Sequence, residues 1–413
     1  MSKYNIIDLF SGCGGLLDGF LQTGKYYPVA SVEWEKRPAE TLVKRLEDKW
    51  NIADAKDSVI RFDIQRVDEL FNGFDDIKYG KHDGLEKLIK NKKVDFIIGG
   101  PPCQAYSVAG RVRDKKNMKE DYRNYLFEYY LEIVSRIQPK LFVFENVPGM
   151  LSAMPDGTPI IDLIKRDIES KGYEIIDDIK KYAVLDASDF NVPQTRKRVI
   201  LIGVNKKYFK NKDIQKELLK FYTKILPKYK SKRKVTVEEA IGDLPKCTPT
   251  FKDTRPSHIV EDCNITWHIP RYHGLRDVKI FKMLAEDLES GSNKYTDSNV
   301  LKDLYNKVTG SSTNVHKYHV LRKDEPSTTI LAHLHKDGLR FIHYDSSQAR
   351  SITVREAARL QTFDDDFNFV GSQGDAYKMI GNAVPVKFAS AIANAIYDFM
   401  KEEWLNGKFS KRA

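Results

Sequence analysis

The chain has 413 residues, 41% of them hydrophobic, which is enough to bury a substantial core, and this length predicts two domains. Its formal net charge of +10 favours an anionic partner, and four cysteines without paired spacing argue against a disulfide framework. No stretch is apolar over the length of a membrane span and the first residues lack a signal-peptide hydrophobic region, so we expect a cytoplasmic protein without membrane contact.

Strand-like and helix-like patterns alternate up to about Val204. Short apolar runs are separated by segments that carry apolar residues at helical spacing. This alternation predicts an α/β fold with a doubly wound, mostly parallel sheet, followed by a second, smaller domain. The predicted strands are Ile6–Phe10, Val29–Glu33, Asp95–Ile98, Leu141–Glu145 and Arg198–Val204, with one more strand ending just before Asp63.

A glycine-rich turn, Phe10–Gly15, lies between the first predicted strand and an apolar helix start. Glycines let the backbone approach a ligand closely at such a turn, although a dinucleotide site or a plain tight turn has the same pattern. Two acids at strand ends add to it. Glu33 could accept hydrogen bonds from ribose hydroxyls and Asp63 from an exocyclic amine, whereas the alternative for each is a capping or turn acid.

Cys103 follows the apolar run Phe96–Ile98 through two glycines and two prolines. Free cysteines are most often buried as small hydrophobic side chains. Here the prolines restrict the backbone just past a strand end, where open α/β sheets hold their chemistry. This position favours a presented thiolate nucleophile.

Glu145 ends another predicted strand of the same sheet, so it should lie near Cys103 although the two are distant in sequence. A buried carboxylate paired with a nearby arginine is the alternative interpretation. In Gln194–Arg198, the spacing of two puts Arg196 and Arg198 on one face of an extended segment. A surface charge run is the alternative there, less favoured because a buried strand follows directly.

From Asn205 onward the strand–helix rhythm stops, and we expect an irregular stretch rich in turns until the helix marked by apolar residues from Phe388 to Phe399. Residues Asn205–Ala240 carry twelve Lys/Arg and four Asp/Glu, a balance of 12 − 4 = +8, with aromatic residues between the lysines. Nucleic-acid contact and a solvated helix face both remain open for this basic run. The spacing of Cys247, His258, Cys263 and His268 fits no common zinc pattern, so we expect no metal.

Several of these segments occur together in one order. As a set they resemble the DNA (cytosine-5)-methyltransferases, of the bacterial restriction–modification type. The resemblance covers both ends of the chain and matches the stretch from about Asn205 to Arg350 less well. The segments that carry it are Asp8–Gly15, Gly99–Arg111, Glu145–Val147, Gln194–Arg198, Thr353–Gln361 and Gly381–Pro385.

The resemblance implies transfer of a methyl group from S-adenosyl-L-methionine to carbon 5 of a cytosine rotated out of double-stranded DNA. Addition of the Cys103 thiolate at carbon 6 would break the aromaticity of the ring and make carbon 5 nucleophilic. Glu145 would act at N3 and the amine. Arg196 and Arg198 would together orient the catalytic loop and contact O2, with Arg198 the favoured base contact. By the same resemblance, the cofactor residues are Phe10, Gly12, Gly14, Glu33, Asp63, Pro102 and Asn382, and the DNA-contacting residues are Ser107 and Arg111.

We further expect a catalytic and cofactor-binding domain in residues 1–204, completed by 375–413, and a target-recognition domain in 205–374. A monomer is expected, with a cognate restriction endonuclease that reads the same site without binding the chain. Three alternatives remain. One is a tRNA cytosine-5 methyltransferase of the same family, although the long, basic recognition region favours DNA. A non-catalytic DNA-binding regulator would explain the charge, and a dinucleotide oxidoreductase would explain the glycine-rich turn alone.

Overall fold

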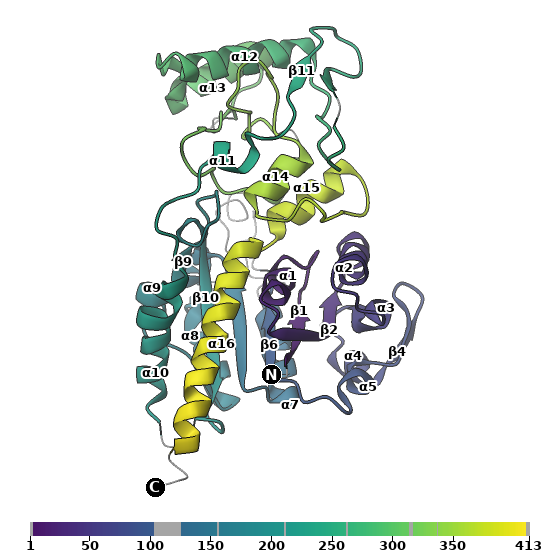
Figure 1. The fold of residues 1–413 in the computed structure, drawn as a ribbon, viewed down its shortest axis with the longest axis vertical. Helices are drawn as coiled ribbons and strands as arrows, with labels where there is room; N and C mark the ends of the chain where they lie inside the picture. Colours follow the sequence, from purple (N-terminus) through teal and green to yellow (C-terminus); the bar gives the residue numbers. More distant parts are fainter. Residues whose placement is uncertain are drawn as a thin grey trace. The chain divides into compact units, whose positions relative to one another are not determined.

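The computed structural model describes residues 3–102, 125–154, 157–209, 212–261, 263–313, 317–336 and 338–409, with the main chain alone for 403–409. Contacts within the chain divide it into two compact units (Figure 1). The first unit comprises Met1–Phe190, Arg196–Lys232 and Val384–Ala413, and the second comprises Asn191–Thr195 and Arg233–Ala383.

The first unit is built on one mixed sheet of eight strands in the order β3-β2-β1-β6-β7-β10-β8, with β9 paired to β10. The strands from β3 to β7 in this order run parallel, while β10 runs antiparallel to β7, β8 and β9. The predicted doubly wound, mostly parallel sheet is therefore confirmed. Its strands are β1 (Tyr4–Leu9), β2 (Tyr26–Glu33), β3 (Val59–Arg61), β6 (Phe96–Gly99), β7 (Leu141–Asn146), β8 (Tyr173–Glu174), β9 (Val184–Asp186) and β10 (Lys197–Asn205).

Helices cover both faces of this sheet, with α16 in front and α7 and α8 behind in the view of Figure 1. The central strands are apolar on both sides because both faces are covered. The helices of the unit are α1 (Gly15–Gln22), α2 (Lys36–Asp48), α3 (Ala55–Ser58), α4 (Val67–Asn72), α5 (Leu85–Ile89), α7 (Leu126–Ile137), α8 (Ile160–Ser170), α9 (Ile179–Tyr182), α10 (Ile214–Lys220) and α16 (Val386–Phe409). A hairpin, β4 (Phe74–Asp76) and β5 (Gly80–His82), and the short turns η3 (Pro148–Ser152), η4 (Ala187–Asp189), η5 (Phe221–Ile225) and η6 (Leu226–Tyr229) complete it.

The predicted C-terminal helix is confirmed as α16, which packs against α1. Phe388, Ile392 and Ile396 are fully buried, and Tyr26 Oη donates to the carbonyl oxygen of Ala393 at 2.6 Å. The helical stretch Gln373–Glu402 is long and apolar enough to cross a membrane, but 72% of its apolar window is buried in the protein. That burial is typical of a core helix.

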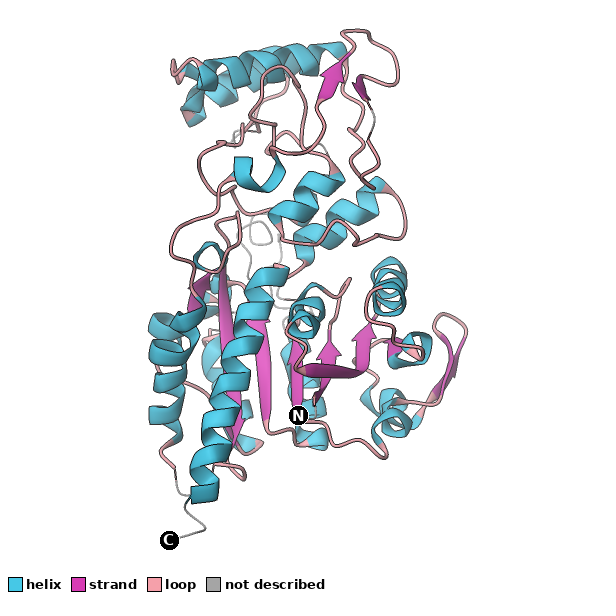
Figure 2. Ribbon diagram, viewed as in Figure 1, coloured by secondary structure: helices cyan, strands magenta, loops and turns pink. Residues whose placement is uncertain are grey.

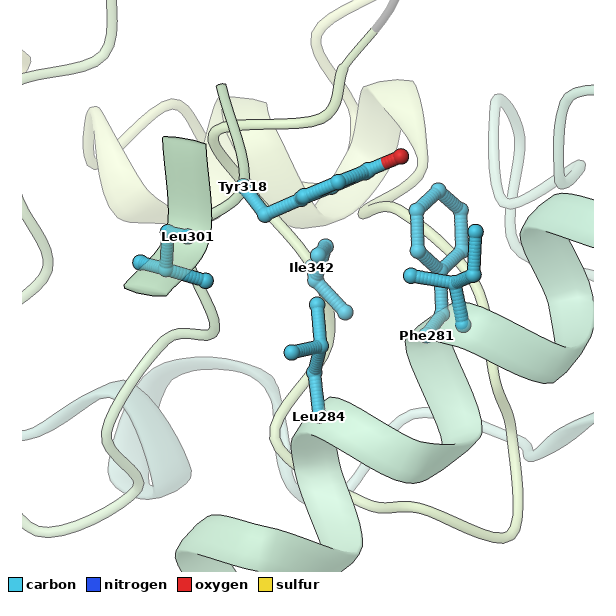
Figure 3. Packing of buried hydrophobic residues seen from close by; sticks show 6 residues of the cluster. Phe281, Leu284, Leu301, Tyr318 and Ile342 are labelled. Atoms are coloured by element: carbon cyan, nitrogen blue, oxygen red, sulfur yellow. The ribbon is translucent and has the colours of Figure 1, made fainter. Parts of the chain in front are cut away.

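The second unit is mostly helix and loop, as the colours of Figure 2 show. We expected its middle stretch to be irregular, and this was wrong for two long helices, α12 and α13. They pack through a small apolar cluster that includes Phe281, Leu284 and Leu301 (Figure 3). Its elements are α11 (Val237–Ile241), β11 (Cys247–Pro249), β12 (His258–Val260), α12 (Leu275–Glu289), η7 (Lys294–Thr296), α13 (Ser298–Thr309), η8 (Ala332–His335), α14 (Val354–Leu360) and α15 (Gln373–Asn382).

Candidate active site

The predicted site residues of the first unit gather where the parallel strands end. Because β1, β2, β3, β6 and β7 run in the same direction, their carboxyl ends meet at one edge of the sheet. The glycine-rich turn follows β1, Glu33 ends β2 and Asp63 comes two residues after β3. Pro101 and Pro102 follow β6, and Glu145 lies near the end of β7.

The glycine-rich turn has the backbone that its sequence suggests. Gly12 and Gly14 have φ values of 55° and 91°, in the region that glycine adopts without strain. A Cβ on Gly14 would lie 2.6 Å from Leu42 Cδ1, so a side chain there would collide with α2. A Cβ on Gly12 would have no atom within 4 Å, so the space beside this turn is open.

Glu33 connects this turn to the end of β2. Its Oε2 accepts a hydrogen bond from the amide of Gly12 and its Oε1 accepts one from the amide of Glu35, both at 2.8 Å. The residue is 7% exposed, and burial raises the pKa of Glu33 to about 7. The carboxylate is thus held at the turn, with lone pairs left to accept from ribose hydroxyls.

Asp63 lies in a turn beyond β3, where one of its oxygens accepts from the amide of Gln65 at 3.1 Å. The preceding Phe62 is fully buried and stacks on Phe74, with ring centroids 3.8 Å apart. This stacking anchors the turn that carries Asp63.

Asp8 is a buried acid in β1 that our sequence analysis did not single out as a site residue. Among the described residues, neither of its carboxyl oxygens has a hydrogen-bond partner, and the same holds for Ser31 Oγ on the neighbouring strand, which is in register with Asp8. Burial and the charge of Glu33 raise the pKa of Asp8 well above its usual range. The signal available in the sequence was an acid inside an otherwise apolar strand.

Glu145 forms an ion pair with Arg198. Arg198 Nε lies 2.8 Å from Glu145 Oε1, and the two side chains are 12% and 13% exposed. The antiparallel register, with Ile200 opposite Glu145, brings the two strands into this position. The pairing with an arginine, which we had given as the alternative for Glu145, is present at the strand end where catalysis was expected.

Arg196 is 2% exposed and lies just before β10. Burial lowers the pKa of Arg196, helped by the positive charge of Arg198 and opposed by Glu145. Burial also lowers the pKa of Arg198, again opposed by Glu145. The two guanidinium groups and the carboxylate of Glu145 therefore form one local group of charges.

The segment that leads toward Cys103 packs against the end of β7. A Cβ on Gly100 would lie 2.6 Å from Glu145 Oε2, and Asn146 Nδ2 donates to the carbonyl oxygen of Pro101 at 3.2 Å. The chain that continues to Cys103 thus starts beside Glu145. Cys103, Ser107 and Arg111 themselves lie outside the described residues.

Asn382, which we assigned to the cofactor site, is the last residue of α15 and is exposed. It belongs to the second unit, whereas the other predicted cofactor residues belong to the first. Its assignment stays a prediction.

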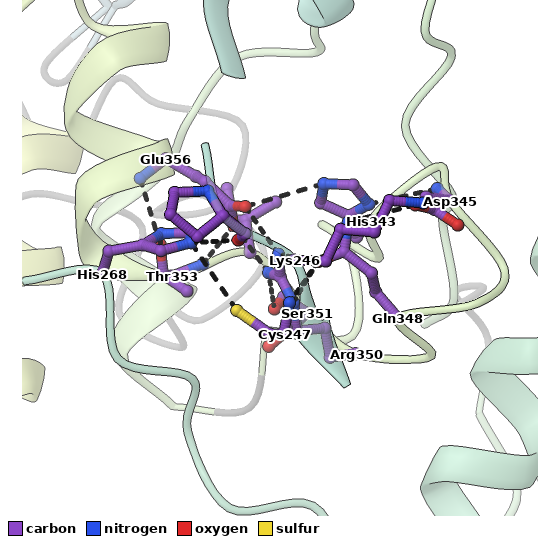
Figure 4. A network of polar contacts seen from close by, with 12 residues as sticks. Lys246, Cys247, His268, His343, Asp345, Gln348, Arg350, Ser351, Thr353 and Glu356 are labelled. Atoms are coloured by element: carbon purple, nitrogen blue, oxygen red, sulfur yellow. Dashed lines mark hydrogen bonds and ion pairs between the residues drawn. The ribbon is translucent and has the colours of Figure 1, made fainter. Parts of the chain in front are cut away.

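The segment Thr353–Gln361 has a structural role in the second unit. Thr353 and Glu356 form a capping box at the start of α14, and Glu356 pairs with Arg350 through two contacts of 2.6 and 2.7 Å (Figure 4). Arg350 and Glu356 are 0% and 1% exposed, so this is a deeply buried ion pair. The Gln194 side chain also lies here and accepts from the amide of Ile330 at 2.9 Å.

Cys247, His258 and His268 in the second unit are engaged in hydrogen bonds. Cys247 Sγ lies 3.6 Å from His268 Nε2, which is also 2.8 Å from the carbonyl oxygen of Pro245. His258 Nε2 contacts the carbonyl oxygen of Gln348 at 2.9 Å. Within the described part of the chain, no three His, Cys, Asp or Glu side chains lie together as a metal site.

Comparisons with known proteins agree with this architecture. Residues 4–398 match the family model of C-5 cytosine-specific DNA methylases. A type II methyltransferase of Bacillus paralicheniformis is 32% identical over an alignment covering 95% of this chain and 98% of that protein. A type II methyltransferase of a Psychrobacter species is 32% identical, covering 95% of this chain and 79% of that protein.

Among solved structures, an E. coli prophage protein described as a DNA modification methyltransferase matches with a TM-score of 0.59 and 23% identity, covering 97% of this chain and all of that one. The Dnmt2 methyltransferase of S. pombe matches with a TM-score of 0.51 and 14% identity, covering 96% and 99%. These likenesses show the fold alone, a Rossmann-like sheet flanked by helices. With the family match across residues 4–398, they lead to one conclusion: the chain belongs to the C-5 cytosine-specific DNA methylase family and is a DNA (cytosine-5-)-methyltransferase.

Proposed function

We propose that the chain methylates carbon 5 of a cytosine rotated out of a specific double-stranded DNA sequence, through a covalent Cys103 adduct, as the modification enzyme of a restriction–modification system. One observation carries the proposal: the segment leading to Cys103 packs directly on Glu145, which is paired with Arg198. The segment that ends two residues before Cys103, an acid and a cation thus lie at one edge of the sheet, which supports the proposal that Cys103 acts there.

The carboxyl edge of the sheet suits S-adenosyl-L-methionine. Space beside Gly12 is open, and the Glu33 carboxylate is held at the same turn to accept from ribose hydroxyls. Phe10, Gly14, Asp63, Pro102 and Asn382 would contribute to this site. When bound, the cofactor supplies an electrophilic methyl group on a sulfonium.

In the reaction, the Cys103 thiolate forms a bond to carbon 6 and the ring takes up the electron pair. Glu145 would hold a proton at N3, so that the ring need not carry a full negative charge. Arg198 would donate to O2 of the base in place of its present bond to Glu145. Carbon 5 then takes the methyl group, and loss of its proton lets the Cys103–carbon 6 bond break and restores the aromatic ring.

DNA in which 5-fluorocytosine replaces cytosine tests the covalent step. Because fluorine cannot leave as a proton does, the adduct should persist as a complex that survives denaturation, dependent on S-adenosyl-L-methionine. The Cys103→Ala variant should form none. Absence of a trapped wild-type complex on any DNA containing the target sequence would contradict the proposal, as would trapping by Cys103→Ala.

Residues 233–374, the part of the predicted target-recognition domain that lies in the second unit, would recognise the target, and Ser107 and Arg111 would contact DNA. Rotating a base out of the duplex costs roughly a few kcal/mol, which contacts from both sides of the base would offset. Competition between labelled DNA and tRNA checks the substrate class. Preferential methylation of tRNA would favour the alternative function, that of a tRNA cytosine-5 methyltransferase.

A further inference from the structure

The edge of the sheet opposite the candidate active site carries a cluster of lysines. The parallel strands β6 and β7 begin at this amino edge, and the antiparallel strand β10 ends there. Lysines flank all three points. They are Lys92 and Lys93 before β6, Lys140 before β7, and Lys206 and Lys207 after β10.

Main-chain hydrogen bonds hold these segments side by side. The amide of Lys140 donates to the carbonyl oxygen of Asp95 at 2.9 Å, and the amide of Asn205 donates to that of Lys140 at 3.0 Å. Asn5 Nδ2 donates to the carbonyl oxygen of Lys93 at 2.9 Å. The lysines therefore project from a rigid, connected backbone.

Little negative charge offsets this cluster. Lys140 pairs with Asp95 at 2.6 Å, whereas Lys92, Lys93 and Lys206 form no ion pair with any described residue. Lys207 Nζ donates to the neutral Gln138 at 3.2 Å. The face thus has an excess of uncompensated positive charge.

Aromatic rings lie among the lysines. Lys93 Nζ is 5.3 Å from the ring centroid of Tyr208, and Lys92 Nζ is 5.6 Å from that of Tyr27. Tyr208 is 46% exposed. We call Lys92, Lys93, Lys206, Lys207 and Tyr208 the amino-edge face.

We propose that the amino-edge face binds the phosphate backbone of a second duplex DNA segment, without reading its sequence. Lysines act on phosphates as point charges, and release of DNA counterions drives such binding. Binding of a protein partner would require an apolar centre, and binding to a membrane surface would require a larger apolar face. The amino-edge face has one exposed tyrosine. The choice of DNA rests on the proposed function. A long DNA substrate bound at the carboxyl edge would bring other segments of the same DNA near the amino-edge face at high local concentration.

Titration with a short labelled duplex of arbitrary sequence at low salt tests the proposal. The duplex is too short to reach both edges of the sheet, so the full-length wild type should bind two per chain. The variant Lys92→Gln/Lys93→Gln/Lys206→Gln/Lys207→Gln should bind one. The slope of log Kd against log salt concentration, added over both binding sites, should be smaller in the variant than in the wild type. The difference should be about 0.9 for each lost phosphate contact.

A control variant with the same charge change, Lys44→Gln/Lys56→Gln/Lys78→Gln/Lys81→Gln, should keep both duplexes, because these exposed lysines lie outside the face. One duplex per wild-type chain would overturn the proposal, as would unchanged binding by the amino-edge variant. Binding of phosphatidylglycerol vesicles through these lysines, with no second duplex, would identify a membrane surface instead. Methyl transfer to a short DNA substrate should be equal in the wild type and both variants. If the wild type transfers no methyl group, that result contradicts the proposed function and says nothing against the amino-edge face.

Discussion

At the scale of single residues, Glu145 and Arg198 link the local structure to the chemistry. Their ion pair, 2.8 Å long and slightly exposed, fixes both side chains at the end of β7. Removing one partner of such a pair leaves an uncompensated charge. An isosteric amide keeps an oxygen for Arg198 and removes only the proton-holding group.

Glu145→Gln should therefore lower the rate of methyl transfer by about 10² to 10⁴ while keeping cofactor affinity near wild type, because general acids contribute on that scale. Single-turnover kinetics measures the rate of methyl transfer, and calorimetric titration measures the affinity for the cofactor. Glu145→Ala, which also leaves Arg198 without its ion-pair partner, should melt at a lower temperature than Glu145→Gln. Near-normal turnover in Glu145→Gln would refute the acid role.

Glu33 makes cofactor binding depend on pH. Burial raises its pKa to about 7, so between the ordinary carboxyl value and pH 7 the folded chain holds a proton that the unfolded chain has lost. The contribution of Glu33 to stability without cofactor therefore falls as pH rises through this window. Ribose hydroxyls donate to the ionised carboxylate, so cofactor affinity should rise over the same window.

Below pH 7 we expect S-adenosyl-L-methionine affinity to fall by up to about tenfold per pH unit, with proton release on binding near pH 7. Calorimetry in buffers of different ionisation enthalpy measures both. Glu33→Gln should bind more weakly and without this pH dependence. The same pH profile in Glu33→Gln would assign the titration to another group.

At the scale of elements, α1 and α16 approach each other at Gly19. A Cβ there would lie 2.4 Å from both Ala389 Cβ and the carbonyl oxygen of Val386, so even alanine is too large. A helical Gly→Ala change otherwise stabilises by up to about 1 kcal/mol. Here overpacking reverses the sign.

Gly19→Ala should lower the free energy of unfolding by about 1–3 kcal/mol in urea titrations. The matched control is Gly374→Ala in α15, where the nearest atom to the new Cβ is Ser372 Oγ at 3.6 Å. That variant should be neutral or slightly stabilised. Equal effects of the two substitutions would show that the contact at Gly19 relaxes without cost.

Sequence patterns predicted elements well where the periodicity was simple. The strands around Ile98 and Val143 are continuous apolar runs, as strands covered on both faces must be. The helices α12 and α13 were missed because charged residues interrupt their apolar spacing, although Val278, Phe281 and Leu284 follow it. Strand direction was also out of reach, since the antiparallel course of β10 is set by pairing between distant segments.

At the scale of the whole molecule, the second unit should respond to acid through its buried histidines. Burial lowers the pKa of His258 to about 4 and those of His273 and His343 to about 3, and it also lowers the pKa of His268. The unfolded chain therefore takes up protons first as pH falls below about 6.5. Stability from these groups is complete above that pH and is lost toward pH 3.

As pH falls into the mildly acidic range, we expect the second unit to lose its fold before the first unit does. Near-UV circular dichroism and the protease resistance of each unit measure this transition. His343→Gln should move this transition to lower pH, because one buried proton acceptor is gone. Carboxylates whose pKa is lowered, such as Glu356, titrate at still lower pH. A transition that stays in place in His343→Gln would show that other groups control it.

The family, the succession along the chain of the strands that carry the site, and the residue types at their ends can all be predicted from the amino-acid sequence, because they depend on local periodicity and on short motifs. Which of these residues meet depends on how distant segments pack in the folded chain. The pair of Glu145 with Arg198 depends on an antiparallel register, and the Asp8 carboxyl, which has no partner in the part of the chain that the structure describes, depends on burial from both faces. The amino-edge face likewise exists only because hydrogen bonds with Asn5 and Lys140 hold the segments that carry Lys93 and Lys206 together from distant parts of the chain.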